Sequence, residues 1–140
     1  MNAPLIIITA VSVVIIGAVL IAVMVMTKGR SGVLIKEGYR TEWLKIENGL
    51  DKNNLATYQF AILAADKLLD QALCELGVSG DNMDNRLKAS KDRFASLSGV
   101  CVAHKLRNQV AHEADSNISL LNARRALATY KKALKELEAI

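Results

Sequence analysis

The chain has 140 residues, of which 51% are hydrophobic and 4% aromatic, and its formal net charge at pH 7 is +4. All 18 basic and all 14 acidic side chains follow residue 27, so an uncharged N-terminal stretch precedes a segment with the charge mixture of a small soluble domain. The modest charge and the few aromatic rings argue against RNA binding through a broad basic patch with base-stacking side chains.

Residues 5 to 26 form an apolar run in which only Thr9 and Ser12 are polar. At about 1.5 Å per residue, a helix of this length measures about 33 Å, which matches a hydrocarbon core of about 30 Å. We therefore expect residues 1–27 to be a transmembrane anchor. A cleaved signal peptide is the alternative, but no basic residue precedes the run and no small-x-small cleavage site follows it.

Basic residues follow the apolar run closely, at Lys28, Arg30, Lys36 and Arg40. The segment before the run has none, so the positive-inside rule predicts a single-pass protein of the inner (plasma) membrane with a cytoplasmic C-terminal domain. The bilayer is then a partner of the chain.

Residues 28–38 are rich in glycine and serine and are expected to be a juxtamembrane linker. The two cysteines, Cys74 and Cys101, are expected to be reduced and buried.

Apolar residues in the remaining segment, 39–140, recur at alternating spacings of three and four, which predicts helices over 39–50, 55–76 and 119–137. Between the last two, Asp81 is expected to cap another helical element. The stretch after Gly99 is expected to bury the line formed by Val102, Leu106 and Val110. No run alternates with period two, so we expect an all-α bundle of four or five helices.

The stretch from Cys101 to Glu113 carries the candidate site, because it places Arg107, Asn108 and His112 in a short, helix-compatible segment. On a continuous helix Asn108 and His112 lie about 40° apart, whereas Arg107 and His112 lie about 140° apart. The arginine and the histidine can meet only if the helix ends or distorts near Ala111, or if two copies face each other across a two-fold axis.

A purely structural role is the alternative for the same residues. Arg107 would then pair with a carboxylate such as Glu113 or one on a neighbouring helix, and His112 would close a helix end. Asp66 and Asp70, one turn apart, either pair with the basic residues of the motif or face water, as most acidic side chains do. An Arg107 held against either aspartate would argue against catalysis.

The run AHKLRNQVAHE (103–113) and the amphipathic stretch LLNARRALATYKKALKELE (120–138) resemble the signature of HEPN domains, the higher-eukaryote and prokaryote nucleotide-binding helical bundles. ILAADKLLDQAL (62–73) and GDNMDNRLK (80–88) are similar to stretches of small membrane-anchored HEPN-like proteins from bacterial genomes. The resemblance thus covers most of residues 39–140, and it implies an HEPN-like bundle.

The resemblance also implies a function, a metal-independent endoribonuclease that acts as a homodimer. In its Arg-Asn-x-x-x-His motif, His112 would be the general acid and base, Arg107 would stabilise charge on phosphate, and Asn108 would orient one of them. RNA or a nucleotide would be the substrate. Other HEPN domains are non-catalytic nucleotide-binding or protein-interaction modules, and the chain is expected to be one or the other.

Two further residues are secondary candidates, His104 and Glu113. His104 lies on the same helical line as Asn108 and His112, so it can border the same cleft. The two histidines are about 12 Å apart along a helix, too far to ligate one metal ion, and we expect neither a metal nor another cofactor.

Overall fold

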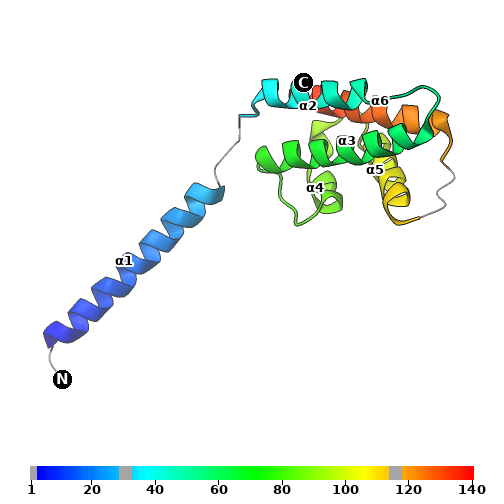
Figure 1. The fold of residues 1–140 in the computed structure, drawn as a ribbon. Helices are drawn as coiled ribbons and strands as arrows, with labels where there is room; N and C mark the ends of the chain where they lie inside the picture. Colours follow the sequence, from blue (N-terminus) through cyan, green and yellow to red (C-terminus); the bar gives the residue numbers. More distant parts are fainter. Residues whose placement is uncertain (1–2, 29–32, 114–117) are drawn as a thin grey trace. The chain divides into compact units, whose positions relative to one another are not determined.

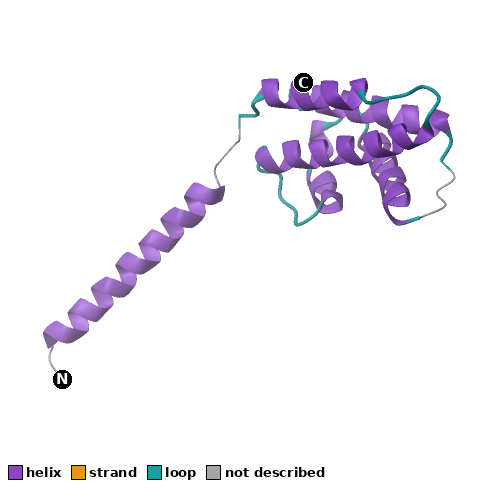
Figure 2. Ribbon diagram, in the orientation of Figure 1, coloured by secondary structure: helices purple, strands orange, loops and turns teal. Residues whose placement is uncertain are grey.

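A computed structural model describes residues 3–28, 33–113 and 118–140 of the chain. Over these residues the chain is helical and contains no strand, which confirms the all-α prediction (Figure 2). It divides into two compact units, Met1–Ser31 and Gly32–Ile140. Its elements are α1 (Ala3–Lys28), α2 (Lys36–Asn48), α3 (Leu55–Glu75), α4 (Met83–Ala89), the 3₁₀ helix η1 (Lys91–Arg93), α5 (Leu97–His112) and α6 (Leu120–Glu136).

The first unit contains α1, in which residues 9–22 are exposed except for the half-buried Gly17. Its exposed side chains are mostly aliphatic and include Val14 and Ile21. No helix combines, over the described residues, the length and the apolar character that crossing a membrane requires. The predicted transmembrane helix is not supported by this finding.

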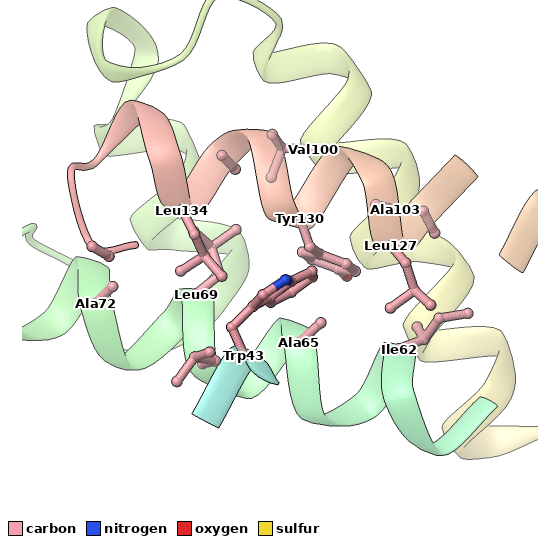
Figure 3. Packing of buried hydrophobic residues seen from close by; sticks show 14 of the residues in the cluster. Trp43, Ile62, Ala65, Leu69, Ala72, Val100, Ala103, Leu127, Tyr130 and Leu134 are labelled. Carbon is pink, nitrogen blue, oxygen red and sulfur yellow. The ribbon is translucent and has the colours of Figure 1, made fainter. Parts of the chain in front are cut away.

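The second unit is built on α3, whose buried face follows the predicted spacing through Ile62, Ala65 and Leu69. Helix α6 packs along α3 and presents Tyr130 and Leu134 to it, and α5 packs against both helices (Figures 1 and 3). All five of these side chains are excluded from solvent, and burying a large aliphatic or aromatic one contributes about 1.5 to 3 kcal/mol. The α3, α5 and α6 junction is therefore the centre of the unit.

Helix α2 covers α3 and supplies Tyr39 and Trp43, one helical turn apart, to the core. The Trp43 side chain points into the space between α3 and α6, beside Tyr130 (Figure 3). The helix begins at Lys36, three residues before the predicted start at Tyr39. Leu34, just before it, is also buried.

The connection between α3 and α5 differs from the prediction. Asn82, rather than Asp81, caps α4, since its side-chain oxygen accepts a hydrogen bond from the Asn85 amide at 2.9 Å. Asparagine and aspartate are comparably good N-caps, so the sequence alone could not choose between neighbours. Gly80 precedes this cap with φ +147°, a backbone conformation that side chains disfavour.

Helix α5 turns a different face to the core than its apolar residues predict. Val102 is 66% exposed and Leu106 and Val110 are half-buried, whereas Val100 and Ala103 are buried. His104 is buried beside them, and its contacts with α3, described below, fix this rotation.

The cysteine prediction is also wrong in part, because Cys74 is exposed and Cys101 half-buried, although both are free thiols.

Candidate functional site: a polar cluster around Asp66

Asp66 is a buried carboxylate, 4% exposed, on the core-facing side of α3. One of its oxygens, Oδ1, accepts hydrogen bonds from His104 Nδ1 on α5 at 2.7 Å and from the Tyr130 hydroxyl on α6 at 2.9 Å. Its other oxygen, Oδ2, lies 3.4 Å from Arg107 Nε. A buried charge is tolerated when it is paired and hydrogen-bonded, so this carboxylate connects the three central helices through their polar side chains.

His104 is nearly as buried as Asp66, at 5% exposure, and its second ring nitrogen faces two groups. Asn108 Nδ2 lies 3.4 Å from His104 Nε2, and the exposed Asp84 carboxylate of α4 lies 3.7 Å from the same atom. The hydrogen bond with Asp66 raises the pKa of His104 above its ordinary value of 6.5, and the charges of Asp66 and Asp84 add to the rise. Burial and the charge of Arg107 oppose it.

The protonation state of His104 decides whether its Nε2 atom interacts with Asn108 or with Asp84. Asn108 Oδ1 accepts a hydrogen bond from Arg107 at 3.0 Å, so its amino group is the end that faces the imidazole. A neutral His104 that keeps its proton on Nδ1 accepts from this amino group at Nε2. A protonated His104 cannot accept there, and its Nε2 proton instead faces the Asp84 carboxylate.

Arg107 is anchored at one edge of its guanidinium group. Nε is buried, lies within ion-pair distance of Asp66 and lacks the geometry of a hydrogen bond, while Nη1 donates to Asn108. The side chain as a whole is 33% exposed, and Nη2 forms neither an ion pair nor a hydrogen bond with another described residue. Arg107 thus contacts Asp66 through Nε on its inner edge, while Nη2 on its outer edge remains a donor without a partner among the described residues.

Tyr130 completes the cluster from α6 and is fully buried. Burial, and then the Asp66 carboxylate, raise the pKa of Tyr130 above its ordinary value, so its hydroxyl keeps its proton and donates it in the hydrogen bond.

His112 and Glu113 lie apart from this cluster. Helix α5 is unbroken through Ala111 and ends one residue later, at His112, and within the described residues this end forms no contact between His112 and Arg107. Both side chains are exposed and form no hydrogen bond or ion pair within the described residues, and the Glu113 amide closes the helix by donating to Gln109 O at 2.9 Å. One chain therefore brings Arg107 and Asn108 together with His104, whereas His112, farther along the same helical line, is exposed and contacts none of them.

Sequence reasoning missed Tyr130 and Asp84 as members of the cluster. For Asp66 it left two alternatives open, pairing with the basic residues of the motif or facing water. A signal for Asp66 existed, because it follows Ile62 by four residues and precedes Leu69 by three, which places it inside the apolar stripe of its helix. A charge in such a stripe is typical of a paired, buried group.

The chemistry available to the cluster is limited by its surroundings. Among the described residues there is no group of three side chains suited to hold a metal ion. Grooves of about 570 and 490 Å³ on the second unit are lined by other residues. The buried part of the cluster is therefore suited to fixing helices, and its exposed part consists of the outer edge of Arg107 and the Asp84 carboxylate.

Comparisons with known proteins identify no relative, because no family model, no curated protein and no solved structure matches the chain. The resemblance to HEPN domains stays a prediction.

Proposed function

We propose that the second unit, Gly32–Ile140, is a non-catalytic helical interaction module. The observation that carries this proposal is the position of Arg107, whose Nε lies 3.4 Å from the carboxylate of the buried Asp66. A catalytic arginine has to direct its charge at a substrate phosphate, whereas here the inner edge of the guanidinium balances a buried carboxylate. In this proposal Arg107 and Asn108 stabilise the α3 and α5 contact.

The position of His112 supports the same proposal. General acid and base catalysis requires the imidazole to lie within hydrogen-bond reach of the reacting group that the arginine binds. Because α5 is continuous, the two side chains point about 140° apart within one chain.

The test is an RNA cleavage assay with the full chain in mild detergent, in the presence of EDTA and a mixed RNA substrate. Wild type and His112→Ala are expected to be equally inactive, while Arg107→Ala is expected to lower the free energy of unfolding. Cleavage by the wild type that disappears in His112→Ala would overturn the proposal.

A metal-independent endoribonuclease assembled from two copies is the second candidate. Two observations favour it: Arg107 keeps an open donor at its outer edge, and His112 is exposed. In such a homodimer, Arg107 of one copy would bind the RNA phosphate, His112 of the other would transfer the proton, and Asn108 would orient the arginine through its hydrogen bond.

A mixing experiment tests this candidate. Arg107→Ala and His112→Ala are each expected to be inactive alone, and a dimer of one with the other retains one intact composite site. Activity that returns on mixing, together with a dimeric mass, would establish the shared site. Continued inactivity of dimers that have exchanged subunits would exclude it.

We also propose that the first unit attaches the chain to a lipid bilayer, with the second unit on the cytoplasmic side of the inner membrane. The apolar run of residues 5 to 26 and the exposed aliphatic side chains of α1 support attachment. The basic residues from Lys28 to Arg40 support the orientation.

A further inference from the structure

A groove of about 490 Å³ runs between α5 and α6, away from the cluster around Asp66. Small residues, Gly99, Ala103 and Ala126, leave space between the two helices. Val102 and Leu106 form its apolar wall, and Val102 is 66% exposed. An aliphatic side chain this exposed beside a hollow offers a contact surface for another molecule.

The charges around this groove have one sign. Lys105 and Arg125 line it together with the amides Gln109 and Asn122, and no acidic residue does. Neither cation forms an ion pair with another residue in the described part of the chain. The groove between α2 and α3 is different, because Glu42 and Lys45 line it and pair with each other at 2.6 Å.

We propose that the α5 and α6 groove docks an acidic amphipathic helix of a partner protein, which gives the interaction module proposed above its class of partner. Apolar residues of that helix would cover Val102 and Leu106, and its carboxylates would face Lys105 and Arg125. Along α5 the groove extends from Gly99 to Gln109, about 15 Å at 1.5 Å per residue, enough for roughly three turns.

Two other occupants fit less well. In a symmetric dimer through this groove, the cations Lys105 and Arg125 of one copy would face those of the other, and juxtaposed like charges oppose association. A nucleic acid would find two cations, but its phosphates would lie over an aliphatic wall with no aromatic ring for base stacking.

The experiment uses the full chain in mild detergent and a fluorescently labelled, 14-residue helical peptide. Its leucines occupy one face and its glutamates the others. A scrambled peptide of the same composition and a version with lysine for glutamate are the peptide controls. The anisotropy of the amphipathic acidic peptide is expected to rise on binding, with an affinity at least tenfold above that of either control.

Variants locate the binding on the protein. Arg125→Glu is expected to weaken binding at least tenfold because it reverses a charge of the groove, and Val102→Ser several-fold because it removes an apolar contact. Lys88→Glu makes the same charge change on an exposed position of α4 and is expected to leave binding unchanged. Circular dichroism melting checks that each variant is folded.

Three results would overturn the inference: no binding of the peptide to the wild type, equal binding to Arg125→Glu, or tighter binding of a single-stranded RNA oligonucleotide with the same dependence on Arg125. None of these bears on the cleavage assay with His112→Ala. The peptide-binding assay therefore tests the docking groove, and the cleavage assay separately tests whether the unit is non-catalytic.

Discussion

At the scale of single residues, Asp66 is the centre of the polar cluster, because its carboxylate accepts hydrogen bonds from His104 and Tyr130 and lies within ion-pair distance of Arg107. Asp66→Asn removes the charge that His104 and Arg107 face. Breaking one partner out of a buried ion network costs about 3 to 5 kcal/mol, so we expect a loss of this order in the free energy of unfolding, measured by urea denaturation.

Tyr130→Phe is the matched control, because it deletes one hydrogen bond to Asp66 and keeps the ring in the core. It is expected to cost about 1 kcal/mol. Equal losses for Asp66→Asn and Tyr130→Phe would mean that the contacts with His104 and Arg107 add nothing to stability.

His104 makes the stability of the second unit depend on pH. Its pKa in the folded chain lies above 6.5, chiefly through the hydrogen bond with Asp66, and the facing groups are Asp66, Asp84, Arg107 and Asn108. A raised folded pKa adds stability that is fully present below the unfolded pKa and is lost as the pH rises through the folded pKa. The free energy of unfolding is therefore expected to fall as the pH rises above about 6.5.

The measurement is urea denaturation at a series of pH values from 5.5 to 9, a window that begins above the range in which ordinary carboxylates titrate. His104→Gln is expected to flatten the profile. His112→Gln, at the exposed end of α5, is expected to keep it. A profile that is unchanged by His104→Gln would refute the assignment.

At the scale of elements, the turn before α4 positions two side chains of that helix. Asp84 lies 3.7 Å from His104 Nε2, and Arg86 forms an ion pair with Asp70 of α3 at 2.7 Å. Gly80 has φ +147°, and a Cβ there would lie 2.7 Å from the Arg86 amide nitrogen. Gly80→Ala is therefore expected to lower the free energy of unfolding by about 1 to 3 kcal/mol. Gly38→Ala in α2 meets no atom within 4 Å and is expected to be neutral or to stabilise by up to about 1 kcal/mol.

Thermal or urea unfolding of the two glycine variants separates backbone strain from helix propensity. If Gly80→Ala were as stable as Gly38→Ala, the turn would be free to adopt another conformation, and the position of Asp84 near His104 would not depend on it.

Helices whose buried face is one continuous apolar stripe, such as α3 and α6, could be predicted, because the spacing of apolar residues is a local property of the sequence. The rotation of α5 was not predictable, since a buried histidine paired with α3 turns Val102 toward solvent. The contact of Arg107 with Asp66 joins residues far apart in the chain. Composition, spacing and motif could name Arg107 and Asn108 and could offer Asp66 or Asp70 as a partner, but only the packing of α3 against α5 selects Asp66.

At the scale of the whole molecule, the two units have opposite surfaces. The second has a buried core and exposed charges, whereas the described side chains of α1, at residues 7 and 9–22, are exposed and mostly aliphatic. Such a helix gains by being covered with apolar material, at about 25 cal/mol per Å² removed from water. The proposed attachment to a bilayer rests on this surface of α1.

We expect the full chain to float with phospholipid vesicles in a density gradient. Ile15→Asp combined with Ile16→Asp places two charges on α1, and each costs about 2.5 to 3.5 kcal/mol when it is held in the centre of a bilayer. Most of this double variant is therefore expected to stay at the bottom of the gradient. Val33→Asp adds a charge at a side chain that is 94% exposed outside α1 and is expected to float like the wild type. If the wild type stayed at the bottom, or if the double variant floated equally well, α1 would not be a membrane attachment, and its aliphatic surface would have to be covered by protein.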